Sequence, residues 1–382
     1  MDFGWSAAQR DYLASVRGFA TESLVADDLA ERDAEGVFWR EGWRRCAGFG
    51  IPGLPVTPEY GGGGHDRLTI VATLEELGYA CRDNGLLFAL NAHLWGCVTP
   101  LLAFGTDEQK KRYLPGLCDG SLVGGLAMTE AGSGSDAYNL RTTALPRDGG
   151  YLLNGDKVYV TNAPVADVLV VIARTGQADG PGSFSAFLVD RETPGLVTGP
   201  PVPKMGLRTA PMGALTLTDC WVPGHARLGP VGAGMSVFTV AMEWERSCIL
   251  ASAVGTMRHL LERCVSYAGG HERFAKPIGR FQAVSHKVVE MKLRLETSRL
   301  MLYHLAWSLT GTRRLPGASA LVKLHLSEAL VQTSMDALQL HGAGGYLTEE
   351  GLERQVRDAL AARLYSGTSD IQRNIVARSL GL

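Results

Sequence analysis

The stretch YLLNGDKVYVTNAPVADVLVVIART (151–175) lies near the middle of this 382-residue chain and decides its fold class. Apolar and polar residues alternate in its first half, which is typical of a half-buried β-strand. Its second half is rich in β-branched residues and indicates another strand. Similar signals return in FSAFLVD (184–190) and ALTLTDCWV (214–222). We therefore predict a β-region from about 121 to 230.

Two features refine this region. Asn154-Gly155 has the chemistry of a two-residue hairpin turn, so we predict a hairpin there. No strand–GxGxxG–helix unit is present, which argues against a nicotinamide-binding Rossmann domain.

Helical periodicity dominates on both sides of the β-region. Before it, AAQRDYLASVRGFATESL (7–24) and DRLTIVATLEELGYA (66–80) predict helices, the second capped by Asp66. Thr106 and Gln109 have capping-box spacing and predict a short basic helix that ends before Pro115. After the β-region, helical patterns cover 233–268, 281–310, 318–341, 350–364 and 368–380.

This order of elements predicts an α+β multidomain protein. We expect an N-terminal α-helical domain at 1–118, a central β domain at 119–230 and a C-terminal helical bundle at 231–382.

Composition excludes several classes of protein. The chain is 46% hydrophobic and 20% charged, with a net charge of −2, so a nucleic-acid-binding surface is not expected. It has no run of about 20 apolar residues, and its N-terminus lacks the basic and apolar blocks of a secretory signal. We therefore expect a cytoplasmic protein that does not bind a membrane.

The seven cysteines are scattered, odd in number and free of any CxxC motif. They are interpreted as reduced, mostly buried thiols, with no disulfide framework and no structural metal site.

Several stretches have the composition of ligand-binding segments. The stretch LAMTEAGSGSD (126–136) is rich in small residues and hydroxyls, and KVYVTNAPVAD (157–167) carries Tyr159 and Thr161 on one predicted strand face. RFAKPIGRFQAVSH (273–286) and LQLHGAGGYL (338–347) join helices. Taken singly, each is explained equally well as a turn, a half-exposed strand or a helix end. A polar turn, Ser366 to Asp370, precedes the final predicted helix.

Together, in this order and spacing, these stretches and KMGLRTAPMGALTLTDCWVP (204–223) resemble the acyl-CoA dehydrogenase family over nearly the whole chain. The resemblance implies a helical N-terminal domain, a central β-barrel-like domain and a C-terminal four-helix bundle. It also implies FAD between the β domain and the bundle, in a homotetramer or dimer whose subunits complete one another's flavin sites.

Site residues follow from the resemblance, position by position. Those expected along the flavin are Leu126, Met128, Thr129 and Ser135, with Tyr159 and Thr161 at its ring. Those expected at the nucleotide part of a neighbour's FAD are Phe281, Gln282, Gln339, Gly342 and Ala343. Thr368 and Asp370 would meet the pyrophosphate, and Ser135, Arg246, Ser366 and Gly367 the substrate.

Two positions in one stretch depart from the family pattern. The family usually places an Arg at the position of His271, where it meets the pyrophosphate, and a Gly at the position of Ala275. Arg273 could supply the missing charge, whereas a neutral His271 would hold a phosphate less strongly.

The resemblance implies that a base removes the α-proton of an acyl thioester while a hydride leaves the β-carbon for the flavin. Such a proton is too weakly acidic for a solvated carboxylate, so the base must be desolvated and the carbonyl polarised. Most members carry the base as Glu at the position of Ser366. In a minority, isovaleryl-CoA dehydrogenase among them, it lies on another helix, just before an Arg.

At the corresponding place, AMEWERSCILASAVG (241–255) offers Glu243 and Glu245, which point to nearly opposite sides of a helix. Glu245 is in register with an apolar stripe, whereas Glu243 shares a polar face. Because burial raises a carboxyl pKa, we predict that Glu245 is the base. The alternatives are a structural Glu245 paired with a distant cation and a solvated Arg246.

Three stretches, WERSCILAS (244–252), 276–300 and YSGTSDIQRNIVAR (365–378), most resemble dehydrogenases that act on acyl or prolyl groups bound to a carrier protein. The expected substrate is thus an acyl thioester on phosphopantetheine, and an electron-transfer flavoprotein could accept the electrons. The alternatives are an ordinary short- or branched-chain acyl-CoA dehydrogenase, a flavin oxidase or monooxygenase, and a flavin-free thioester-binding protein. His93 borders the acyl pocket by resemblance, but a core histidine with satisfied hydrogen bonds explains it equally well.

Overall fold

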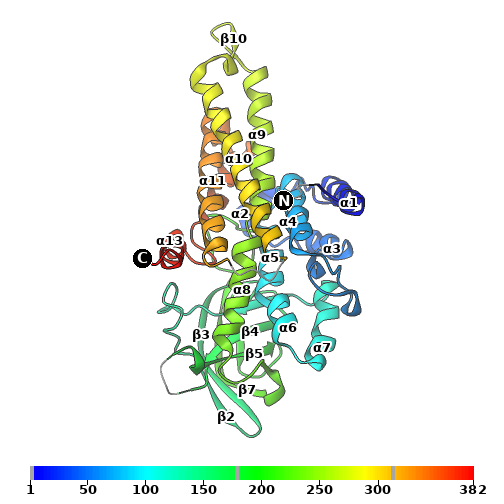
Figure 1. The fold of residues 1–382 in the computed structure, drawn as a ribbon, viewed down its shortest axis with the longest axis vertical. Coiled ribbons are helices and arrows are strands. Elements are labelled where there is room, and N and C mark those ends of the chain that lie inside the picture. Colours follow the sequence, from blue (N-terminus) through cyan, green and yellow to red (C-terminus); the bar gives the residue numbers. More distant parts are fainter. Residues whose placement is uncertain (1–3, 177–179, 311–314) are drawn as a thin grey trace.

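The structure is a computed structural model that describes residues 4–176, 180–310 and 315–382 (Figure 1). Its N-terminal helices are α1 (Ala7–Ser23), α2 (Leu29–Glu35), α3 (Arg40–Gly48), α4 (Arg67–Ala80), α5 (Asn84–His93), α6 (Thr99–Phe104) and α7 (Asp107–Cys118). The strands of its main sheet are β1 (Gly124–Ala127), β2 (Thr143–Arg147), β3 (Gly150–Thr161), β4 (Val168–Arg174), β5 (Phe184–Asp190), β6 (Leu196–Thr198), β7 (Met212–Pro223) and β8 (Arg227–Leu228). Its later elements are α8 (Gly234–Cys248), α9 (Ala251–Gly270), β9 (Glu272–Arg273), β10 (Lys276–Pro277), α10 (Gln282–Ser308), α11 (Ala318–Leu340), α12 (Leu352–Ala361) and α13 (Ser369–Ser379).

The predicted helix starts in the N-terminal part are confirmed. Asp66 accepts a hydrogen bond from the backbone N–H of Thr69 at 2.7 Å and caps α4. Thr106 and Gln109 form the capping box of α7. The predicted end of α7 before Pro115 is wrong, because the helix continues to Cys118. Pro115 removes only one N–H, and the buried Leu117 in this last turn packs in the core, which outweighs that loss.

The sheet follows the order β6-β7-β3-β2-β4-β5-β8, and β1 pairs with β4 in parallel. Strand β4 is buried on both faces, which explains its uninterrupted apolar sequence. Val168, Val170 and Ile172 face a core shared with α6, α7 and α8, whereas Leu169 and Val171 face a core shared with β3 and β7.

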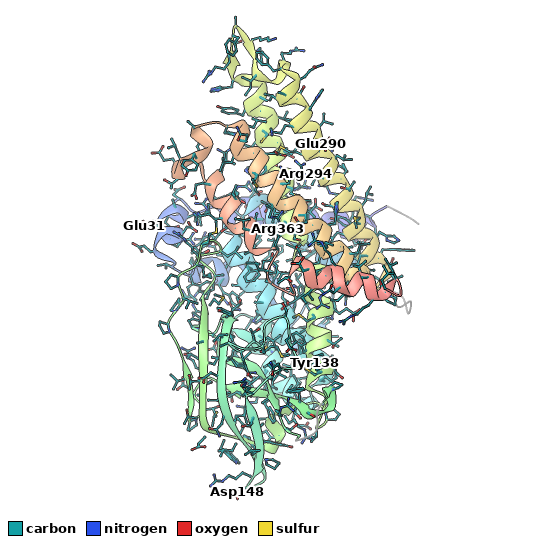
Figure 2. All side chains as sticks on the ribbon, turned by 90° about the vertical axis from the view of Figure 1, so that its left-hand side faces the viewer. Glu31, Tyr138, Asp148, Glu290, Arg294 and Arg363 are labelled. Atoms are coloured by element: carbon teal, nitrogen blue, oxygen red, sulfur yellow. The ribbon has the colours of Figure 1, made fainter. Side chains whose placement is uncertain are left out.

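The hairpin predicted at Asn154-Gly155 is wrong. The turn between β2 and β3 is instead Asp148-Gly149, both with positive φ, at the far tip of the sheet (Figure 2). Asn154 and Gly155 lie inside β3 at a bulge, where the Asn154 amide binds Asp219 of β7. The side chain of Asn154 therefore finds a cross-strand partner that sequence periodicity does not reveal.

The helix predicted over 233–268 is divided at Ile249 and Leu250 into α8 and α9. Apolar, helix-compatible residues continue through this break, so the sequence carries no signal of it. The two helices have different partners: α8 packs on α6 and the sheet, whereas α9 packs on α4. The other C-terminal helices agree with prediction within a few residues, and the break predicted at 311–317 lies partly outside the described residues.

Helices α9, α10 and α11 are long and run side by side away from the sheet, and the β9–β10 turn lies at their far end (Figure 1). Helix α13 lies at the opposite end, close to where α8 meets the sheet (Figure 1). The positions predicted to meet a neighbour's FAD thus lie at the end of the bundle opposite the predicted positions on α13.

Two further features concern buried residues. All seven cysteines are free and buried. The continuous helical stretch Asn84–Phe104, 21 residues long, is apolar enough to cross a membrane, but 78% of its apolar window is buried inside the protein. It is therefore explained as a core helix.

Helices α4 and α9 approach closely through two glycines. A Cβ atom on Gly78 would lie 1.9 Å from the Ser252 carbonyl oxygen, and one on Gly255 would lie 2.0 Å from that of Glu75.

We expect Gly78→Ala to destabilise the fold by about 2–3 kcal/mol because the helices must separate. Gly18→Ala is the control, because no atom outside its own helix lies within 4 Å of an added Cβ, and it should stabilise by about 0.5 kcal/mol. Thermal melting checks both, and an unchanged melting temperature for Gly78→Ala would contradict the close packing.

Candidate active site

The turn between α12 and α13 has an unusual backbone. Ser366 has φ +56° and Gly367 has φ +89°, so two successive residues occupy the left-handed region. This conformation suits glycine but costs a serine about 1 kcal/mol, and it persists because the surroundings hold it. Thr368 then caps α13 by accepting a hydrogen bond from the N–H of Ile371 at 3.2 Å.

Three side chains hold the carbonyl groups of this turn. The Ser366 oxygen accepts hydrogen bonds from Arg246 Nε at 3.2 Å and from Gln372 Nε2 at 2.9 Å. The Gly367 oxygen accepts from Lys323 Nζ at 2.9 Å and from Gln372 Nε2 at 2.8 Å. Two cations from different helices therefore fix the direction of the peptide groups in the turn.

Glu245 lies directly against the same turn. The Ser366 hydroxyl donates a hydrogen bond of 2.7 Å to its Oε2 atom. The residue keeps an intermediate exposure, yet its carboxyl group is surrounded by protein, and this burial raises its pKa to about 6. The hydroxyl of Ser366 and the charges of Arg246 and Lys323 oppose that rise.

The two candidate acids are placed as the helical periodicity predicts. Glu243 is exposed, whereas Glu245 faces the turn. The structure thus brings together Glu245, Arg246, Ser366 and Gly367, and the catalytic and binding roles of these residues remain predictions.

Sequence reasoning missed the aromatic stack that holds this part of α8. Trp244 lies between Arg67, whose guanidinium carbon is 3.7 Å from its ring centroid, and Trp95, stacked at 5.3 Å. Arg67 also donates a hydrogen bond of 2.8 Å to the Ser247 hydroxyl. Because Trp244 lies between the two acids in sequence, its packing fixes which of them faces inward. The sequence Glu243-Trp244-Glu245 does not by itself indicate that Trp244 packs on Arg67 and Trp95.

The loop after β1 is anchored by a buried ion pair. Lys157, on β3, donates hydrogen bonds to Glu130 Oε1 at 2.8 Å and to the Met128 carbonyl at 3.0 Å. Glu130 also accepts from the backbone N–H groups of Arg141 and Thr142. Beyond this anchor, the loop exposes Ser135 and its small neighbours.

Tyr159 and Thr161 do not simply alternate along one strand face. A bulge interrupts β3 between Lys157 and Val160, and Tyr159 has φ +57° and is 68% exposed. Thr161 is half-buried, as are Leu126 and Thr129, and Met128 is buried. These residues lie at the end of the sheet nearest the helices, and their roles remain predictions.

The residues expected at a neighbour's nucleotide gather at the far end of the bundle. Tyr267 of α9 stacks on His271 at 4.3 Å and contacts the His341 ring at 4.2 Å, so the ends of α9 and α11 meet there. The surrounding residues with full or partial exposure are Arg273, Phe281, Gln282, Gln339, Gly342 and Ala343.

Backbone strain marks the position where the family pattern has a glycine. Phe274 and Ala275 have φ +53° and +60°, and Phe274 is 90% exposed. A glycine at 275 would adopt this conformation without strain. Arg273 donates a hydrogen bond to the carbonyl of Glu272, and its guanidinium is exposed.

Two other predicted positions have local explanations. Asp370 is exposed and pairs with Arg373 at 2.8 Å on α13. His93 is fully buried, and it accepts from the Gly124 N–H at 2.9 Å while its other nitrogen lies 3.1 Å from the Leu117 carbonyl. Burial lowers the pKa of His93 to about 4. It is therefore a core histidine whose hydrogen bonds are satisfied.

The chain belongs to the acyl-CoA dehydrogenase family. Its residues 6–121, 125–220 and 232–381 match the N-terminal, middle and C-terminal domain models of acyl-CoA dehydrogenase. This confirms the resemblance and the three-part fold predicted from the sequence, whereas the predicted domain boundaries remain predictions. The chain is thus an oxidoreductase of this family.

Its similarity extends to particular members. It is 41% identical over 382 residues to the L-prolyl-[peptidyl-carrier protein] dehydrogenase of Serratia sp. (strain ATCC 39006), covering 100% of this chain and 99% of the relative. The solved prolyl acyl carrier protein oxidase AnaB is 46% identical with a TM-score of 0.97, covering 99% of this chain and 100% of AnaB. A structure of PigA with FAD and proline is 40% identical with a TM-score of 0.97, covering 100% of both chains.

The raised pKa of Glu245 has a consequence for stability. A carboxyl group whose folded pKa, about 6, exceeds its ordinary value of 4.5 ionises more readily in the unfolded chain. Its ionisation therefore lowers stability as pH rises through about 6, by on the order of 1–2 kcal/mol. We expect Glu245→Gln to melt at a higher temperature than the parent at pH 8, with a smaller difference at pH 5. The exposed Glu243→Gln is the control, and an equal effect of both variants would contradict the burial of Glu245.

Proposed function

We propose that this protein is an FAD-dependent dehydrogenase of a prolyl or related acyl group held as a thioester on a carrier protein. The observation that carries the proposal is the Glu245–Ser366 pair, in which a desolvated carboxylate on α8 faces a serine where most members of the family carry the base. The names of the similar Serratia dehydrogenase and of AnaB support the carrier-bound prolyl substrate.

The residues present fit FAD. The Oε1 atom of buried Gln372 has no partner among the described residues and can accept a hydrogen bond from a bound hydroxyl or amide. The loop 131–136 exposes small residues that allow a planar ring close to the backbone. We propose that Leu126, Met128, Thr129, Ser135, Tyr159, Thr161, Thr368 and Asp370 of one subunit hold FAD. When bound, FAD supplies the acceptor for the hydride that leaves the β-carbon.

The residues of this chain perform the proton chemistry. Glu245 takes the α-proton of the thioester, and the electron pair of that C–H bond forms the α,β double bond as the hydride leaves. The hydrogen bond from Ser366 to Oε2 leaves Oε1 available for the proton. With a pKa of about 6, the carboxyl group is largely ionised at pH 7 and remains a stronger base than a solvated carboxylate.

A small cavity lies beside Tyr365, the residue that precedes the turn. A cavity of about 40 Å³ is lined by residues that include Phe88, Ile249 and Tyr365. Ile249 lies one helical turn beyond Glu245, and Tyr365 precedes Ser366. Neither Glu245 nor Ser366 lines this cavity, so its volume sets no limit on the length of the acyl group.

We propose that a second copy of the chain completes each site. Within one chain, the residues at 273, 281–282, 339 and 342–343 lie at the end of the bundle opposite α13 (Figure 1). Their exposure leaves them available to a neighbour's nucleotide, as in the dimers and tetramers of the family.

A second candidate function concerns the electron acceptor. AnaB is named an oxidase, whereas the Serratia relative is named a dehydrogenase. An oxidase would consume dioxygen during turnover, whereas a dehydrogenase would need an electron-transfer flavoprotein or a dye. Oxygen uptake with substrate and no other acceptor distinguishes the two.

Glu245→Gln should keep fold and bound flavin but lower the rate of anaerobic flavin bleaching by prolyl carrier protein by at least about a thousandfold, because the base is lost. Glu243→Gln is a matched control on the same helix and should bleach at a rate close to that of the parent. Stopped-flow absorbance measures both rates. Bleaching of Glu245→Gln at the parent rate would refute the assignment of the base.

Carrier dependence is tested by comparing prolyl and simple acyl groups on CoA and on a carrier protein. We expect kcat/KM to be at least about tenfold higher for the carrier-bound prolyl group, because docking of the carrier adds binding energy. Equal values for CoA and carrier would remove the carrier-protein part of the proposal and leave an ordinary acyl-CoA dehydrogenase.

A further inference from the structure

Lys323 of α11 is a buried charge with no role in the proton chemistry described above. Its side chain is fully buried, and within the described residues it forms no ion pair. The other fully buried lysine, Lys157, is paired with Glu130 at 2.8 Å. An ammonium group that is buried without a paired carboxylate is unfavourable for folding, so its presence calls for another explanation.

The surroundings of Lys323 connect it to the candidate base. Its Nζ atom donates to the Gly367 carbonyl at 2.9 Å and lies 5.6 Å from the Tyr365 ring centroid. The charged groups that act on it are Glu245 and Arg246 from α8 and Glu328 from its own helix. Glu328 is already occupied by Arg363 at 2.5 Å and by the Ser369 hydroxyl at 2.9 Å.

We propose that Lys323 is a positioning residue that holds the Ser366-Gly367 turn and supplies positive charge that keeps the Glu245 carboxylate ionised in its desolvated position. This rests on the proposed function, because it assigns Lys323 to the environment of the proposed base.

The geometric part of the proposal follows from the backbone. The Gly367 peptide group is planar, so a donor bound to its carbonyl also fixes the direction of the Thr368 N–H. Gln372 donates to the same carbonyl, but it also donates to the Ser366 carbonyl, so Lys323 is the donor dedicated to Gly367. Without it, two adjacent left-handed residues would lose one of the contacts that hold them.

The electrostatic part follows from the balance at Glu245. Burial raises the pKa of Glu245, and the Ser366 hydroxyl, Arg246 and Lys323 lower it. Burial and Arg246 lower the pKa of Lys323 to about 8, which still leaves it charged at neutral pH. Tyr365 also faces Glu245, and burial raises its pKa, so it stays neutral there. Lys323 and Arg246 are therefore the cations that favour the ionised base.

The test compares Lys323→Met, which removes both the hydrogen bond and the charge, with Lys323→Arg, which keeps the charge. Lys292→Met is the control, because Lys292 is exposed and pairs with Glu296 on the surface of α10. The rate of flavin bleaching by substrate is measured from pH 5 to 9. In the parent we expect the rate to rise with an apparent pKa of about 6.

In Lys323→Met we expect this acid limb to move up by about one pH unit, which corresponds to a rate about tenfold lower at pH 5.5 and a much smaller deficit at pH 8.5. Lys323→Arg and Lys292→Met should keep the limb of the parent. If Lys323→Met loses activity equally at every pH, or if its limb does not move, the electrostatic role is refuted. If Lys323→Met does not fold, Lys323→Gln, which can donate a hydrogen bond but has no charge, should show the same shift and is judged by the same criteria.

A second measurement does not depend on activity. Because burial lowers the pKa of Lys323 to about 8, its charged form opposes folding, and the parent should gain stability as it deprotonates between about pH 8 and 10. The melting temperature of the parent should therefore rise relative to that of Lys323→Met over this range. A constant difference would mean that Lys323 is not a desolvated cation and would overturn the proposal.

Failure of the two proposals can be told apart. If Glu245 is not the base, Glu245→Gln bleaches normally and the parent has no acid limb that depends on Glu245. If Glu245 is the base but Lys323 has no positioning role, Glu245→Gln is inactive while the acid limb of Lys323→Met coincides with that of the parent.

Discussion

The site depends on one constraint: a carboxylate must be withdrawn from water and still carry its charge. Glu245 loses solvation where α8 packs against the turn at Ser366, and this burial raises its pKa. A hydroxyl from Ser366 and the positive charges of Arg246 and Lys323 oppose protonation without neutralising the carboxylate through a direct ion pair. A close ion pair would remove its basicity, and full hydration would also do so. The surroundings of Glu245 therefore balance burial, which favours the protonated form, against nearby positive charge, which favours the ionised form.

The environment of Glu245 is built from elements in distant parts of the chain. Arg67 and Trp95 belong to the N-terminal helices, and together they hold Trp244 on α8. The turn at Ser366 comes from the C-terminal end of the chain. The close approach of α4 and α9 through glycines fixes the N-terminal helices against the bundle, so the site cannot form from the bundle alone. The loop after β1, which we expect to lie along the flavin, is anchored by its own buried ion pair between Lys157 and Glu130.

Sequence alone predicts the parts of the fold that depend on local periodicity and on motifs in a fixed order. The helical, β and helical regions, the caps at Asp66 and Thr106, and the inward choice of Glu245 over Glu243 all follow from that information. The predictions that are wrong concern features set by tertiary contacts. Asn154-Gly155 becomes a bulge because its amide pairs across the sheet, and α8 separates from α9 because each helix packs on a different part of the protein. The burial of Lys323 could not be predicted from the sequence for the same reason, because its hydrogen-bond partner, Gly367, lies 44 residues away in sequence.

The burial of the seven cysteines affects how readily they are oxidised in a flavin-dependent enzyme. Burial raises the pKa of each thiol, for example to about 12 for Cys97 and about 11 for Cys220, so the nucleophilic thiolate is scarce at physiological pH. Peroxide formed when a reduced flavin meets oxygen attacks thiolates far faster than thiols. The interior thus carries sulfur that resists oxidation to sulfenic acid.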